Sequence, residues 1–222
     1  EEEEEEPREA FVPKAEDLDA GLPAGVLVRN LRATHEYLAR QEQGAAAADA
    51  LGGVAAALAA RGLLRSTDGD VRLLDACCLA DIVRVYAPSP PYDEAALRAV
   101  FALFLAELRG LGEPDGARYA LHYFLAERLA AVKAAVLLLD LGADLVDELF
   151  ATVYALAGAG VAPPAEARLL DIAAACVDEA DALPAAALDA VLLPLTLPAR
   201  REAPRACAFS RSLVQRCPAR IR

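Results

Sequence analysis

The chain has 222 residues and a formal net charge of −12 at neutral pH, and it contains neither methionine nor tryptophan. Aromatic residues make up only 5%, too few for a typical β-sandwich or for a surface that stacks nucleobases. The length is sufficient for one large domain or a short solenoid. Because the first residue is Glu and no Met follows, we expect a piece of a longer protein.

The N-terminal residues 1–20 are strongly acidic. They hold ten acidic residues, six of them the opening Glu run, against Arg8 and Lys14, which gives a net charge of −8. A block of like charges repels itself and buries no apolar surface. We therefore predict an acidic disordered tail over residues 1–20 and a folded unit over residues 21–222.

From residue 21 onward the apolar pattern is helical, good helix formers dominate, and the breaks fall at Gly and Pro clusters. Asp70 and Asp93 are suitable N-caps, and Pro164 and Pro184 suit the first turn of a helix. No strand is predicted, so the fold class is all-α. The predicted helices lie near residues 24–42, 45–62, 70–86, 94–109, 116–140, 144–158, 164–178, 184–197 and 201–217.

An internal repeat favours a solenoid over a bundle. The segment RLLDACCLAD (72–81) recurs as RLLDIAAACVD (168–178), 96 residues further on, which is about two units of a helical-hairpin repeat. An Asp cap, Val-Arg, and then a helix that is apolar almost all round is typical of the second helix of a HEAT unit. We predict an α-α superhelix of HEAT-like or armadillo-like helical repeats.

Two adjacent cysteines, Cys77 and Cys78, raise the question of a metal or redox site. On a helix they project about 100° apart, so they cannot bind one metal ion together. No CxxC or CxxxH spacing occurs, and the only histidines are His35 and His122. We expect both thiols to pack in the core, with no metal and no cofactor.

The segment YAPSPPY (86–92) has three prolines in four positions between two tyrosines. Such a run predicts an extended, polyproline-like path between two helices. It is either a rigid connector or a preorganised docking edge for a short peptide, beside which an Arg side chain can pair with an acidic or aromatic partner group. The candidate partner-binding residues are Arg84, Tyr86, Ala87, Pro88, Pro91 and Tyr92.

Motifs of catalysis are missing from the sequence: we find no nucleophile elbow, P-loop, HExxH or dinucleotide glycine pattern. The candidate carboxylate pairs are Asp75 with Asp81 and Asp171 with Asp178. The spacings Arg72 to Asp75 and Asp81 to Arg84 instead favour ion pairs along a helix. We expect no enzymatic activity.

The C-terminal residues 199–222 hold seven arginines and one Glu, a net charge of +6. They either form a solvated helix face or contact DNA phosphates weakly, through Arg200, Arg201 and Arg205. No apolar stretch of about 18 residues is free of charges, so we expect no contact with a membrane.

The stretch DVRLLDACCLADIVRVYAPSPPY (70–92) closely resembles the N-terminal region of the sister chromatid cohesion proteins of the Pds type, the HEAT-repeat regulators of the cohesin ring. The likeness continues in ARYALHYFLAERLAAVKAAVLLLDL (117–141), DELFATVYALA (147–157) and LDAVLLPL (188–195). It covers residues 20–222 and is most specific over residues 70–92. Family members are far longer, so this chain resembles their N-terminal part.

The resemblance implies a scaffold that acts in the nucleus on chromosomes. Such proteins bind the kleisin subunit of cohesin, recruit the releasing factor Wapl or its antagonists, and help the cohesin acetyltransferase; most of the kleisin-binding part lies further along the chain. The family's docking motif reads Ala-Pro-acid-Ala-Pro. Ala87, Pro88 and Pro91 match it, whereas Ser89 replaces the acid and Pro90 the second Ala. Two alternatives stay open, a generic HEAT or armadillo adaptor for another protein and a weak DNA-binding helical module.

Overall fold

The computed structural model describes residues 11–196, 201–218 and 220. Within these ranges every regular element is a helix, which confirms the all-α prediction. In chain order the elements are η1 (Ala15–Leu18), α1 (Ala24–Ala39), α2 (Ala45–Leu58), α3 (Arg61–Leu64), α4 (Gly69–Val85), α5 (Glu94–Leu108), η2 (Arg109–Gly112), α6 (Tyr119–Ala131), η3 (Ala134–Leu137), α7 (Leu138–Leu141), α8 (Ala143–Ala159), α9 (Pro163–Glu179), α10 (Ala185–Leu192), η4 (Leu193–Leu195) and α12 (Pro204–Arg216), where η denotes a 3-10 helix. None of these helices is long and apolar enough to cross a bilayer.

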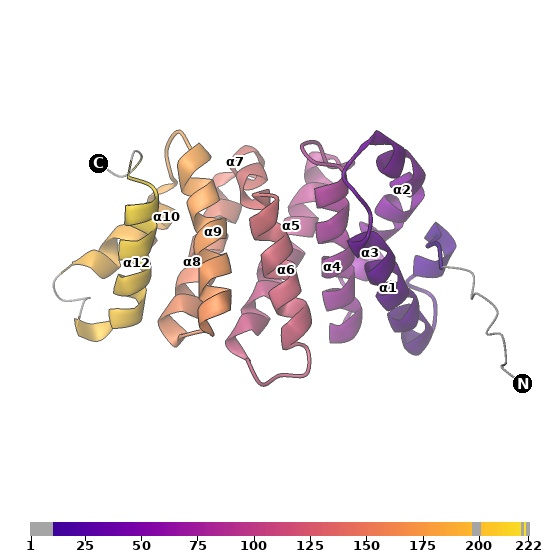
Figure 1. Cartoon of the computed structure of the whole chain (residues 1–222), viewed down its shortest axis with the longest axis horizontal. Helices are drawn as coiled ribbons and strands as arrows, with labels where there is room; N and C mark the ends of the chain where they lie inside the picture. The colour runs from indigo at the N-terminus through magenta and orange to yellow at the C-terminus, as the bar shows by residue number, and fades with distance from the viewer. Residues whose placement is uncertain (1–10, 197–200, 219, 221–222) are drawn as a thin grey trace, which may run out of the picture.

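The helices stack in two layers (Figure 1). One layer consists of α1, α4, α6, α9 and α12, each packed against the next. The other layer contains α5, α8 and α10, with α2 and α3 at the N-terminal end. From α4 onward the long helices alternate between the layers, so the chain advances one helical hairpin at a time. This arrangement confirms the predicted α-α superhelix.

The internal repeat corresponds to the spacing of the hairpins. Its first copy begins at Arg72 on α4 and its second at Arg168 on α9, in the same layer. Helix α6 lies between them and contacts both. The two copies are therefore two repeats apart, as the sequence spacing predicts.

A single apolar core runs between the layers, and α4 is its most deeply buried helix. Cys77 and Cys78 are both fully buried on α4. The Cys77 thiol donates to the carbonyl of Leu121 on α6 at 3.5 Å, and the Cys78 thiol donates to that of Leu31 on α1, also at 3.5 Å. Burial raises the pKa of both thiols well above the usual range. The cysteines are core residues that face opposite neighbours, as predicted.

The predicted Asp70 cap is wrong, and part of the segment predicted as a tail is helical. The first residues 1–10 of the expected tail lie outside the described residues, but Ala15–Leu18 forms η1 and buries Leu18 at its contact with α1 and α2. The N-cap of α4 is Asp68, whose carboxylate accepts from the backbone amides of Asp70 and Val71.

The predicted helix over residues 116–140 is divided into three parts. Helix α6 ends at Ala131, and Lys133 has a left-handed backbone with φ of +51°. The chain then continues through η3 and α7. The run of Ala, Val and Leu in this segment has no Gly or Pro to mark the break, so packing against α9 and α5 overrides the local helix propensity. This break forms one wall of the candidate site.

Candidate functional site

The proline segment between α4 and α5 forms a tight turn, which corrects the predicted extended path. The Ala87–Pro88 peptide bond is cis, and the backbone amide of Ser89 donates to the carbonyl of Tyr86 at 3.0 Å. A cis-Pro at the third position defines a type VI turn, in which the chain reverses direction. Asp93 then caps α5, accepting from the amide of Ala96 at 2.8 Å.

Both tyrosines of the segment turn inward toward α2. The Tyr86 hydroxyl donates to the carbonyl of Ala48, and the Tyr92 hydroxyl donates to that of Ala55 at 3.2 Å. Burial raises the pKa of both phenols. The side chain of Gln43, in the loop before α2, adds a 2.6 Å hydrogen bond to the carbonyl of Ala87. Three hydrogen bonds therefore hold the turn against α2 and the loop before it.

Arg84 fixes the start of the turn. Its Nε donates to the buried carboxylate of Asp81 at 2.8 Å, while Nη1 and Nη2 donate to the carbonyls of Gln41 and Leu38 at 2.8 and 2.9 Å. The Leu38 carbonyl lies in the last turn of α1, and Gln41 follows just beyond the end of that helix. Arg128 of α6 lies 3.3 Å from the same Asp81 oxygen, so one buried acid links α1, α4 and α6.

An apolar groove of about 330 Å³ opens beside the turn. Ala87, Pro88 and Pro90 form one wall, and the broken segment after α6 forms the other. Two opposite charges, Lys133 and Glu179, lie on the lining. The groove-lining residues are Val83, Ala87, Pro88, Pro90, Val132, Lys133, Ala134, Val136, Leu137 and Glu179.

The structure divides the six predicted site residues into two groups. Ala87 and Pro88 line the groove, and Pro91 is exposed just beyond it. The other three, Arg84, Tyr86 and Tyr92, have their polar groups bonded within the chain and support the turn from behind. The opposite wall was missed, because nothing in the sequence indicates that the helix breaks at Lys133.

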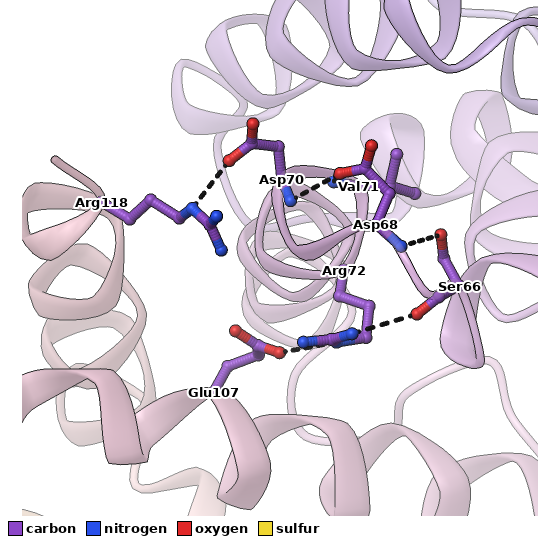
Figure 2. A network of polar contacts seen from close by, with 7 residues as sticks. All are labelled: Ser66, Asp68, Asp70, Val71, Arg72, Glu107 and Arg118. Atoms are coloured by element: carbon purple, nitrogen blue, oxygen red, sulfur yellow. Dashed lines mark hydrogen bonds and ion pairs between the residues drawn. The ribbon is translucent and has the colours of Figure 1, made fainter.

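A second polar network lies at the other end of α4 (Figure 2). Arg72 bridges Glu107 of α5 at 3.1 Å and the carbonyl of Ser66 at 3.2 Å, and Arg118 pairs with Asp70 at 2.8 Å. Figure 2 shows that these groups join the starts of α4 and α6 to the end of α5. The predicted ion pair between Arg72 and Asp75 is wrong, because Asp75 points into the core. The predicted pair of Asp81 with Arg84 is confirmed.

The two histidines and Asp75 lie in the surroundings expected of residues with a structural role. Burial lowers the pKa of His35, which contacts the edge of the Phe124 ring, and that of His122. Asp75 is fully buried and reaches no solvent. Among the described residues, no group of three His, Cys, Asp or Glu side chains is placed to bind a metal ion.

The C-terminal arginines are partly used within the chain. Arg205 donates to the carbonyl of Ala159 at 2.5 Å, and Arg216 pairs with Asp171 of α9. Arg200 lies outside the described residues. Arg205 is one of the three arginines predicted to contact DNA, and its guanidinium is already committed to the end of α8.

These features define a HEAT-like helical-repeat protein whose candidate site is a proline turn beside an apolar groove. Comparison with known families then gives a match over residues 26–222 to the family described as "Sister chromatid cohesion protein PDS5 protein". The chain belongs to this family.

Individual relatives agree. The chain is 36% identical to sister chromatid cohesion protein PDS5 of Saccharomyces cerevisiae over 138 residues, which is 61% of this chain and 11% of that protein. It is 42% identical over 78 residues to PDS5 homolog A of Danio rerio and of Homo sapiens, covering 35% of this chain and 6% of each relative. The chain therefore spans about a tenth or less of the length of these relatives.

A solved structure shows the same architecture. The structure described as "Structure of the Pds5-Scc1 complex and implications for cohesin function" matches with a TM-score of 0.79 and 27% sequence identity. The match covers 90% of this chain and 31% of that chain. The helical-repeat fold of the chain is thus that of a solved Pds5.

Proposed function

We propose that this chain acts as part of a cohesin-associated regulatory scaffold in sister chromatid cohesion, in the nucleus and on chromosomes. Membership of the PDS5 family over residues 26–222 supports this role. The matched solved structure is of a complex of Pds5 with Scc1, which supports the kleisin subunit of cohesin as a partner. The proposed activity is binding, with no chemical reaction. The described core places its thiols and Asp75 out of the reach of a substrate.

The proposed docking site is the groove beside the turn of residues 86–92. One observation carries it: Pro88 and Pro90 face an apolar groove while Tyr86, Tyr92 and Arg84 hold the turn from behind. A surface that is already ordered before binding loses little conformational entropy when a peptide docks. Arg84, Tyr86 and Tyr92 therefore position the site, and Ala87, Pro88 and Pro91 contact the peptide.

The proposed peptides come from a Wapl-type releasing factor, its antagonists or the cohesin acetyltransferase. An apolar side chain of the peptide enters the groove and packs against Pro88 and Leu137. The turn itself has Ser89 where the related motif has an acid. Glu179 lies on the lining of the same groove and supplies a carboxylate there for a basic group of the peptide.

A binding titration tests this proposal. The 222-residue chain is titrated with fluorescent peptides that tile Wapl and the kleisin of the same organism, beside the variants Pro88→Ala and Val136→Glu. We expect saturable binding that each variant weakens by about tenfold, equivalent to about 1.4 kcal/mol. Pro114→Ala is the matched control, because Pro114 is an exposed loop proline that does not line the groove. Binding that both groove variants leave unchanged would place the peptide elsewhere.

A further inference from the structure

The outward side of α5 is unusual for a solvated helix. Ala95, Ala99, Ala102 and Ala106 are all exposed, and the spacing of these residues places them along one side of the helix. Arg98 borders this alanine stripe on the side of α8, and its guanidinium is bound to Asp144 and to the carbonyl of Leu141. In contrast, α1 of the other layer exposes Arg29, Arg32 and Glu36, the usual composition of a face in water.

A groove of about 560 Å³ runs along one side of the alanine stripe. Ala99, Ala102 and Ala106 form its floor, and Arg61 and Arg65 of the α3 region stand at its rim. A third lining arginine, Arg72, is already bound to Glu107. Arg61 and Arg65 are exposed, and neither makes an ion pair with any residue that the structure describes. The groove therefore combines an apolar floor with two uncommitted positive charges.

A second groove of about 300 Å³ continues this surface toward α8. It is lined by Arg109, Ala151, Thr152, Ala155 and Leu156, and Arg109 extends the alanine stripe three residues beyond Ala106. Thr152 is only 4% exposed, and its Oγ1 has no hydrogen-bond partner in the described part of the chain. The hydroxyl itself is shielded from the groove, so the lining is apolar apart from Arg109.

We propose that the alanine stripe and its two flanking grooves bind an acidic amphipathic helix of a partner protein. Alanines allow a helix to approach closely, and the grooves on either side accept its aliphatic side chains. The carboxylates of the bound helix pair with Arg61 and Arg65 on one side and with Arg109 on the other. Arg109 is available because its 3.3 Å pair with Glu148 is exposed and hence weak.

Charge complementarity selects this occupant. A basic helix would be repelled by three arginines at the rims, and a purely apolar one would leave Arg61 and Arg65 beside a dry interface without counter-charges. The site is separate from the proline turn, since none of its residues lines the groove beside Pro88. The two proposed binding sites can therefore be tested independently.

The test uses a defined probe, a fluorescein-labelled 21-residue helical peptide with Leu and Ala on one face and Glu on the other. Its binding to the 222-residue chain is followed by fluorescence anisotropy. We expect saturable binding that Arg61→Glu with Arg65→Glu weakens by at least about tenfold. Arg29→Glu with Arg32→Glu makes the same change in net charge on α1, and we expect it to change the affinity less than about twofold.

Four results would overturn the proposal. The first is failure of the acidic peptide to bind, and the second is equal binding of a version with Lys in place of Glu. The third is a loss of affinity in the α1 control as large as in the groove variant. The fourth is another occupant, revealed in either of two ways. Binding that becomes about tenfold tighter after removal of residues 1–10 would assign the surface to the chain's own Glu run. A dimer in light scattering that Ala102→Glu dissociates would assign it to a second copy.

Discussion

The fully buried carboxylate of Asp81 accepts a 2.8 Å hydrogen bond from Nε of Arg84, one helical turn further along α4. The same guanidinium donates its two other nitrogens to the carbonyl of Leu38, in the last turn of α1, and to that of Gln41, just beyond its end. Arg84, which the sequence suggested as a partner contact, thus connects two neighbouring repeats. Its planar fork of donors satisfies three acceptors at fixed angles, which a lysine cannot do.

Replacing this guanidinium is expected to destabilise the chain strongly. Arg84→Ala leaves Asp81 with Arg128 alone and removes the cap of α1, so the free energy of unfolding should fall by about 3 kcal/mol. Arg84→Lys should recover only a small part of this loss. Urea unfolding followed by circular dichroism measures both values.

Arg109→Ala serves as the control for that experiment, since the pair of Arg109 with Glu148 is exposed on both sides. Its loss should lower the free energy of unfolding by less than about 1 kcal/mol. Equal effects of the two alanine variants would show that the buried joint contributes no more than a surface pair.

A second expectation concerns Asp75, which is buried with neither carboxylate oxygen hydrogen-bonded to the described residues. Burial raises the pKa of this carboxyl well above its usual value, because the charged form loses its hydration. The folded chain therefore retains a proton that the unfolded chain releases. This contribution to stability is complete below the unfolded-state pKa of about 4 and is lost as the pH rises toward the folded-state pKa.

Asp75→Asn removes this titration while preserving the shape of the protonated acid. The variant should be more stable than wild type at pH 8, and the difference should shrink toward pH 4. Urea unfolding of both proteins at several pH values measures the difference. Asp171→Asn is the matched control at the corresponding repeat position, where the carboxylate pairs with Arg168 and Arg216, and it should be destabilising. A pH-independent difference at Asp75 would mean that this acid is charged in the folded state.

The features that depend on residues close together in the sequence were predictable. The helical period, the Asp93 cap and the repeated Arg-Leu-Leu-Asp motif placed α4, α5 and the spacing of the layers correctly. The directions of side-chain bonds across repeats were not predictable. The Tyr86 hydroxyl donates to the carbonyl of a residue 38 positions earlier. Arg72 pairs with Glu107, 35 positions later, and not with Asp75 on its own helix. Such partners are set by how whole helices pack, and one helix's periodicity does not encode this.

The break after α6 gives a third expectation. Lys133 has φ of +51°, a left-handed conformation that is unfavourable for a residue with a Cβ and easy for glycine. Lys133→Gly should therefore leave the free energy of unfolding unchanged or raise it by up to about 1 kcal/mol. Urea unfolding of the variant measures this change.

The control is Glu127→Gly, an exposed position within α6 itself. There glycine should lower the free energy of unfolding by about 1 kcal/mol, as in any helix interior. A similar loss at Lys133 would mean that the helix continues through this residue, as its apolar pattern predicts, and that the wall of the groove beside Pro88 is absent in solution.

The last expectation contrasts two glycines. Gly110 lies against the imidazole of His122, and an added Cβ would overlap the ring. The half-buried ring borders a groove of about 280 Å³ and must shift to admit the methyl group, so Gly110→Ala should lower the free energy of unfolding by about 1 kcal/mol. Gly52→Ala, in the interior of α2 with nothing within 4 Å of the added Cβ, should instead raise it by about 0.5 to 1 kcal/mol. Thermal and urea unfolding of both variants measure the contrast. Stabilisation by both alanines would mean that the His122 ring can move away from Gly110 with no loss of free energy. This contact would then not hold the end of α5 against α6.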